Sequence, residues 1–87
     1  MAQAKILIVD DEVVVAEDIR RQLRVLGYLV VGVVASGEDA VRLAGEHRPD
    51  VVLMDIKLNG MMDGIDAARI IQSQYGTPVI YLTAFSD

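Results

Sequence analysis

Four short runs of aliphatic residues recur along the chain, with longer amphipathic stretches between them. The runs are rich in Val, Ile and Leu and occupy residues 6–9, 29–35, 51–54 and 79–82. Apolar residues are continuous within each run and do not alternate with polar ones, as in parallel strands that helices cover on both faces. The pattern therefore predicts four buried strands of one parallel sheet.

Helical periodicity marks the first interval between these runs. Its apolar positions share one face of a helix and are Val15, Ile19, Leu23 and Leu26. Glu17 and Arg21 are spaced for an i,i+4 ion pair on the polar side, and Gly27 is suited to end the helix. We therefore expect a helix here with one face packed on the sheet.

The other two intervals also predict helices. Ser36 is suited to cap the second helix because Asp39 follows three residues later, and this helix continues to His47. The third helix carries apolar residues at helical spacing, namely Ile65, Ala68 and Ile71. Strands and helices thus alternate throughout, which predicts an α/β fold with a doubly wound parallel sheet. Binding sites in such sheets lie beyond the carboxyl ends of the strands.

Composition narrows the class of protein. Hydrophobic residues make up 53% of the 87 residues and charged residues 24%, which predicts one globular domain over residues 1–87. The net charge of −5 disfavours direct nucleic-acid binding because it would repel the phosphate backbone. No apolar run approaches the roughly 20 residues that cross a bilayer, so no membrane association is expected. The sequence has no cysteine and does not begin like a signal peptide, which favours a cytoplasmic location.

Acidic residues and one threonine follow the predicted strands. Asp10, Asp11 and Glu12 come directly after the first strand, Asp55 follows the third and Thr83 follows the fourth. The carboxyl ends of parallel strands share one edge of a sheet, so these carboxylates would repel one another. The arrangement is costly unless a hard cation binds among them or some of them become protonated. Mg²⁺ is the predicted cofactor. Beside it a carboxylate could attack phosphorus to form an acyl phosphate, which the hydroxyl of Thr83 could hydrogen-bond.

Simpler roles also fit each of these residues taken alone. Asp10 and Asp11 could cap the following helix and interact with its dipole. Asp55 could cap a loop, and Thr83 could be an ordinary strand residue. Separate capping roles do not require all four residues to stand at strand ends of one repeating pattern. Their joint occurrence therefore favours a shared site.

Three motifs at these positions resemble the signatures of receiver domains of two-component response regulators. The motifs are ILIVDDE at residues 6–12, VVLMD at 51–55 and LTA at 82–84, in the family's order and spacing. The resemblance covers nearly the whole chain and implies a flavodoxin-like fold with strand order 2-1-3-4, to which the family adds a fifth strand. It also implies phosphorelay signalling, with a sensor histidine kinase or a phosphotransfer protein as partner.

The same resemblance implies a role for each residue of the predicted site. Asp55 would be the phosphoacceptor, and Thr83 would be the switch hydroxyl. Asp11 and Asp55 would bind Mg²⁺ directly, while Asp10 would assist through water. Lys57 would contribute its backbone carbonyl to the metal. The protein would then not be an enzyme but a phosphoacceptor that assists its own phosphorylation and dephosphorylation.

Two features depart from the family pattern. The loop at residues 57–64 has Asn59 where proline is common and is one residue longer. The family's fifth strand carries a lysine that binds the phosphoryl group, and this chain ends before that strand. Lys5 and Lys57 are not convincing substitutes. We therefore expect a receiver domain without the C-terminal part of the fold, in which residues 79–82 form an exposed edge that promotes self-association.

Two other functions stay open on the sequence. An interaction module of receiver fold could act by dimerisation without phosphorylation, because the family lysine is missing. A phosphatase of the haloacid dehalogenase type would also use Mg²⁺ and an aspartate after the first strand. Such enzymes have a second aspartate two residues later, where this chain has Glu12. Phosphorylation assays separate the interaction module from the receiver interpretation.

Overall fold

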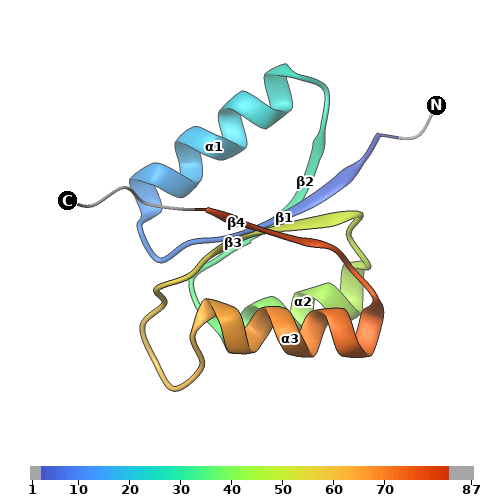
Figure 1. Cartoon of the computed structure of the whole chain (residues 1–87). Coiled ribbons are helices and arrows are strands. Elements are labelled where there is room, and N and C mark those ends of the chain that lie inside the picture. The colour runs from blue at the N-terminus through green and yellow to red at the C-terminus, as the bar shows by residue number, and fades with distance from the viewer. Residues whose placement is uncertain (1–2, 83–87) are drawn as a thin grey trace.

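The computed structural model describes residues 3–82, and Figure 1 shows strands alternating with helices along this part of the chain. The strands are β1 (Lys5–Val9), β2 (Leu29–Val34), β3 (Val51–Asp55) and β4 (Val79–Leu82). The helices are α1 (Val13–Val25), α2 (Gly37–His47) and α3 (Gly64–Tyr75). The paired strands are parallel and lie in the order β2-β1-β3-β4. The predicted α/β fold and strand order are therefore confirmed.

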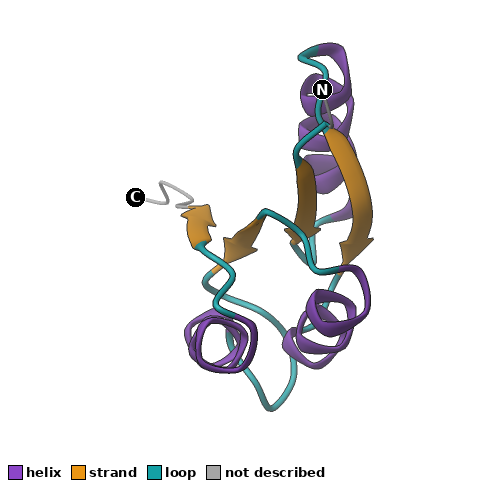
Figure 2. Ribbon diagram, turned by 90° about the vertical axis from the view of Figure 1, so that its right-hand side faces the viewer, coloured by secondary structure: helices purple, strands orange, loops and turns teal. Residues whose placement is uncertain are grey.

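Helices lie on both faces of the sheet. α2 and α3 run side by side on one face, and α1 lies on the opposite face (Figure 1 and Figure 2). β1 stands between β2 and β3 in the middle of the sheet, so helices on either face reach it. Its residues 6–9 are buried as a result. The residues that follow β1 are therefore anchored by the best-packed part of the fold.

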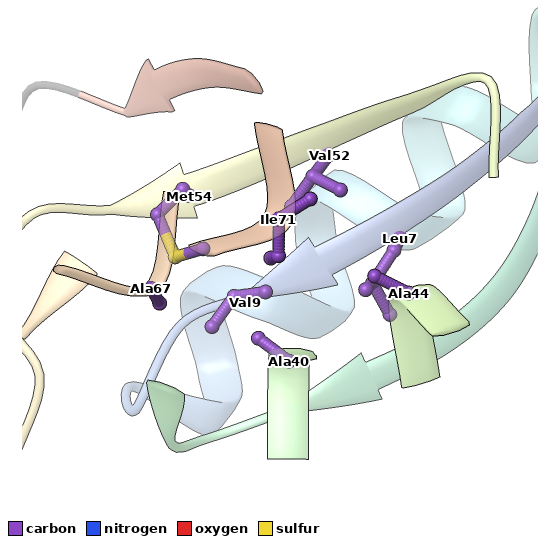
Figure 3. Packing of buried hydrophobic residues seen from close by; sticks show 8 residues of the cluster. All are labelled: Leu7, Val9, Ala40, Ala44, Val52, Met54, Ala67 and Ile71. Carbon is purple, nitrogen blue, oxygen red and sulfur yellow. The ribbon is translucent and has the colours of Figure 1, made fainter. Parts of the chain in front are cut away.

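The main core lies between the sheet and the helices α2 and α3. Figure 3 shows its buried side chains, which are Leu7, Val9, Ala40, Ala44, Val52, Met54, Ala67 and Ile71. Successive residues of a strand point to opposite faces, so Ile6 and Ile8 pack instead with Ala16 of α1. The strands supply large side chains and the helices supply mainly alanines. This division lets α2 and α3 lie close to the sheet at high packing density.

The edge strands are less buried than the sequence pattern predicts. Ile80 of β4 is 55% exposed, and no residue of β2 is fully buried. α1 packs on β1 and β2, and within residues 3–82 no helix packs extensively on β3 and β4 from that side. The prediction that both faces are covered is therefore correct for β1 and β2, which α1 and α2 contact from opposite faces, and wrong for β4, where Ile80 is exposed. Self-association through β4 stays a prediction.

α1 is the longest helix of the described residues, with 13 residues, and no helix within residues 3–82 has the length and apolar character to span a membrane. Its buried face is rotated from the predicted one. Ala16 is buried, with Ile19 and Leu23 packed beside it, whereas Val15 is exposed and Leu26 is 71% exposed. Leu26 is the cap residue, where the helix has already ended, so it does not extend the apolar face.

Local interactions at the helices follow the predicted pattern with one exception. The Ser36 Oγ accepts a hydrogen bond from the Asp39 N–H at 3.2 Å, which confirms the predicted cap of α2. Glu17 pairs with Arg20, whose Nη2 lies 2.6 Å from Glu17 Oε2, and not with the predicted Arg21. Residues three apart are neighbours on a helix surface as well as residues four apart, so either arginine was a possible partner.

Candidate functional site

The carboxyl ends of β1 and β3 bring three carboxylates together. Val9 pairs with Met54 in the parallel register, so the next residues of the two strands, Asp10 and Asp55, emerge side by side. Carboxylate oxygens of Asp10, Asp11 and Asp55 all lie within 4.8 Å of one another. We call these three residues the acidic cluster. It lies at the sheet edge expected from the strand pattern.

Asp10 is the most enclosed member of the acidic cluster, with 7% of its surface exposed. Its N–H extends the sheet pairing by donating to the Val34 carbonyl at 2.9 Å. Its Oδ1 accepts from the Glu12 N–H at 2.9 Å. Glu12 stands at the N-cap position of α1, but its side chain makes no capping hydrogen bond. Helix capping therefore does not account for the run of acids after β1.

Asp55 ends β3 in a partly buried position beside the other two acids. Burial raises the pKa of its carboxyl group, and the charges of Asp10 and Asp11 raise that pKa further. The backbone N–H groups of Lys57 and Ile56 oppose this rise, and the Lys57 nitrogen lies 3.3 Å from Asp55 Oδ1. The net rise in pKa means that the ionised carboxylate is held at a cost in free energy. A cation among the three acids would offset that cost.

The acidic cluster suits a small divalent cation that prefers oxygen ligands. Mg²⁺ binds carboxylate, carbonyl and water oxygens at about 2.1 Å, which places opposite ligands about 4.2 Å apart. The 4.8 Å span of the acidic cluster is close to that size, so small side-chain movements would complete a site. A donor set made of carboxylates also disfavours softer metals, which prefer thiolate or imidazole ligands. The residues present therefore fit the predicted ion.

The other predicted site residues differ in how the structure places them. Lys57 lies two residues after the end of β3, with its N–H toward Asp55 and its surface exposed. Lys5 lies at the opposite end of the sheet, where its Nζ donates to a backbone carbonyl at the end of α2, so it is far from the acidic cluster. Thr83 lies outside the described residues. Leu82, the residue before it, pairs with Asp55 across β3 and β4.

Gly64 supports the site in a way that sequence reasoning missed. It is buried at the start of α3, and its N–H donates to the Ile56 carbonyl at 2.9 Å. A Cβ at this position would collide with the backbone carbonyl oxygen of Asp55, so glycine is what allows α3 to begin this close to the end of β3. Asp63 caps the helix by accepting from the Asp66 N–H at 2.8 Å. The available signal was an Asp-Gly pair just before a helical pattern.

Comparison with known proteins identifies the family. The family model of the response regulator receiver domain matches residues 6–87. The transcriptional regulatory protein PdtaR of Mycobacterium tuberculosis is 45% identical over 83 residues, which cover 95% of this chain and 40% of PdtaR. The chain therefore spans less than half the length of this relative.

Solved structures agree in fold. The signal receiver domain of a modulated diguanylate cyclase from Desulfovibrio desulfuricans matches with a TM-score of 0.92 and 42% identity, covering 97% of this chain and 67% of that one. The response regulator PhyR from Brucella abortus matches with a TM-score of 0.88 and 36% identity, covering 97% of this chain and 35% of PhyR. Sequence, strand order and structural similarity all lead to one conclusion: the chain belongs to the response regulator receiver domain family.

Proposed function

We propose that Asp55 accepts a phosphoryl group from the phosphohistidine of a sensor histidine kinase or a phosphotransfer protein, in a Mg²⁺-dependent phosphorelay in the cytoplasm. The observation that carries this proposal is the acidic cluster, where Asp10 and Asp11 lie within 4.8 Å of Asp55 at the end of β3. In a receiver-family protein this arrangement offers a carboxylate nucleophile and a place for a cation beside it.

Phosphoryl transfer to this site would form one bond and break one. A carboxylate oxygen of Asp55 attacks phosphorus, the P–N bond to the donor imidazole breaks, and the imidazole leaves after taking up a proton. Asp55 must be ionised to attack, and its raised pKa reflects the cost of that state in a partly buried position beside two other acids. Bound Mg²⁺ supplies positive charge that offsets this cost and the charge of the phosphoryl oxygens.

The surroundings of each acid support different roles in holding the cation. Asp11 and Asp55 are the proposed direct ligands. Asp10 is buried and already accepts a hydrogen bond from the Glu12 N–H, which suits an outer position that acts through water. The backbone carbonyl of Lys57 is a further proposed ligand, because this residue follows the nucleophile in the same turn.

Thr83 is the proposed switch hydroxyl, which would hydrogen-bond the phosphoryl group on Asp55. Support comes from the register of β4, in which Leu82 pairs with Asp55. β3 and β4 therefore end at the same level of the sheet, and Thr83 is the next residue in the sequence after β4. A hydroxyl there would couple the chemical state of Asp55 to the conformation of the segment after β4.

The test is labelling of the folded protein by acetyl phosphate in the presence of magnesium. Asp55→Asn should abolish the label because an amide is not a nucleophile. Asp66→Asn is the matched control, since Asp66 is an exposed acid in the first turn of α3 outside the acidic cluster, and it should keep full labelling. Circular dichroism checks that both variants are folded. Labelling that persists in folded Asp55→Asn would overturn the assignment.

The same experiment separates the alternative functions. A folded wild-type protein that binds Mg²⁺ but takes no label from phosphodonor or kinase would favour an interaction module that acts without phosphorylation. A haloacid dehalogenase-type phosphatase would instead carry its covalent intermediate on Asp10. The family match and the position of Asp55 support the receiver function over this second alternative.

A further inference from the structure

The loop between β3 and α3 contains a dipeptide whose chemistry the phosphoacceptor function does not use. Asn59 is the sole asparagine of the chain, and Gly60 follows it. Both residues are exposed in the loop, outside any helix or strand. Gly60 has a φ of 110°, and apart from its two chain neighbours no residue has a heavy atom within 4 Å of where its Cβ would be. The backbone on the carboxyl side of Asn59 is therefore unhindered.

Asparagine followed by glycine can react with its own backbone when this backbone is free. The deprotonated Gly60 nitrogen attacks Asn59 Cγ, a new N–C bond closes a five-membered succinimide, and the side-chain amide leaves as ammonia. Water then opens the ring at either carbonyl and leaves aspartate or isoaspartate at position 59. A side chain on the following residue would hinder the attack, and glycine has none. Asparagine is correspondingly among the thermolabile residues.

The attack requires a backbone N–H that the fold does not hold. Within residues 3–82, the Gly60 N–H makes no hydrogen bond, and neither does the Asn59 side chain. Leu58 and Met62 pack against the core on either side, and Asn59 and Gly60 lie exposed between them. The geometry thus leaves the nucleophile and the electrophile of the reaction free to meet.

A second dipeptide in the same loop provides an internal contrast. Asp63 and Gly64 could form the same succinimide, with loss of water in place of ammonia. Here the Gly64 N–H donates to the Ile56 carbonyl at 2.9 Å, and Asp63 Oδ1 accepts from the Asp66 N–H at 2.8 Å. Gly64 is also buried against the end of β3. The fold therefore holds both reacting groups of this second dipeptide and leaves those of the first free.

We infer that Asn59 is a site of spontaneous deamidation in the folded protein, whereas Asp63 is protected from the equivalent reaction. The product changes the loop that follows the proposed phosphoacceptor. Residues 56–63 carry one positive charge, on Lys57, and one negative charge, on Asp63, so the loop goes from neutral to −1. The isoaspartate product also lengthens the loop backbone by one carbon.

The experiment compares the folded chain with the same chain unfolded in urea, both incubated at mildly alkaline pH. Peptide mapping by mass spectrometry follows conversion at Asn59, and an isoaspartate-specific methyltransferase detects isoaspartate at positions 59 and 63. We expect folded and unfolded protein to convert Asn59 at rates within a few-fold of each other, and Asp63 to form isoaspartate in urea only. Circular dichroism checks that the first sample stays folded.

Asn59→Gln is the matched control, because glutamine would have to close a less favourable six-membered ring. The folded variant should show no conversion at position 59 over the same period, and the chain's own Gln3, Gln22, Gln72 and Gln74 should also stay intact. Asn59 that survives in the folded protein while the unfolded chain is fully converted would overturn the inference. Isoaspartate at position 63 in the folded protein at the rate seen in urea would also contradict it.

Discussion

Charged side chains are hydrogen-bonded to the backbone of neighbouring elements at one end of the sheet, and like charges are gathered together at the other. At the amino ends of β1 and β3, the Lys5 N–H donates to Asp50 Oδ2 at 2.7 Å and the Asp50 N–H donates to the Lys5 carbonyl at 2.8 Å. Lys5 Nζ also donates to the His47 carbonyl at 3.1 Å. At the carboxyl ends, the acidic cluster gathers three negative charges, and within residues 3–82 its side chains accept from the backbone N–H groups of Glu12 and Lys57.

This difference separates residues that stabilise the fold from residues that serve a ligand. Each hydrogen bond at the amino ends is worth about 1 kcal/mol, and together they join β1, β3 and α2. Like charges at the carboxyl ends oppose folding, and such arrangements persist where the surrounding structure holds them in place. Substitutions at the amino ends should therefore weaken the folded state, whereas neutralising the carboxyl ends should weaken ligand binding.

The largest effect is expected from a methyl group added on the side of the acidic cluster. Gly64→Ala should lower the free energy of unfolding by about 1–3 kcal/mol, because the new Cβ meets the backbone carbonyl of Asp55, which cannot easily move. Gly45→Ala is the matched control near the amino ends, where the new Cβ meets the hydroxyl end of the Tyr75 side chain. Its loss should be smaller, since that side chain can shift and alanine favours the helix. Urea unfolding measures the stability of both variants. Equal losses would show that the backbone carbonyl of Asp55 yields as easily as the Tyr75 side chain.

The next effect concerns ligand binding at the carboxyl ends. Asp11→Asn should weaken Mg²⁺ binding by at least about tenfold, because even changes one shell further from a metal cost about that much. Glu12→Gln removes a neighbouring charge outside the acidic cluster and should weaken binding far less. Titration calorimetry compares the two variants with the wild type. An Asp11→Asn protein with wild-type affinity would show that the cation is placed wrongly.

The same chemical change can be made at each end of the sheet in the metal-free protein. Asp50→Asn should lower the free energy of unfolding by about 1 kcal/mol, because it weakens the acceptor of the Lys5 N–H. Asp11→Asn removes a repelling charge and should leave that free energy unchanged or raise it by less than about 1 kcal/mol. Chemical denaturation without metal measures both. Destabilisation of similar size at the two ends would remove the distinction between them.

The smallest effect is the pH dependence of the metal-free protein. Because the pKa of Asp55 is higher in the folded state than in the unfolded chain, the folded state binds this proton more tightly. The contribution of Asp55 to stability should therefore rise as the pH falls from neutral through the raised pKa toward about 4, and it should be lost as the pH rises again. Saturating Mg²⁺ should suppress this trend, because the cation favours the ionised carboxylate.

Urea midpoints across this pH range, measured for wild type and Asp55→Asn, isolate the contribution of the one group. The variant should lack the component that increases stability toward lower pH. Profiles of wild type and variant that run parallel over the whole range would show that Asp55 does not titrate as described.

Much of the fold was predictable because it depends on local pattern. Continuous apolar runs and helical periodicity predicted strands and helices in the order observed, and parallel crossovers predicted that strand ends would share one edge. Apart from the ion-pair partner of Glu17, which is Arg20, the errors concern burial. Leu26 and Ile80 are apolar and yet exposed. Leu26 is the cap residue at the end of α1, and no helix of the described residues packs over Ile80. Periodicity reports which residues are suited to a core, but not which of them a neighbour covers.

The sequence by itself determined the order of the elements, the acids at the ends of the first and third strands, and the family motifs that contain them. Tertiary structure alone decided the 4.8 Å span of the acidic cluster, the direction of the Asp55 pKa shift and the close contact of Gly64 with the end of β3. The first two depend on the register of β1 against β3, which brings together residues more than 40 positions apart, and the third depends on how α3 packs against the end of β3. Propensity acts within a few residues, whereas desolvation, repulsion and steric fit depend on neighbours that folding alone supplies.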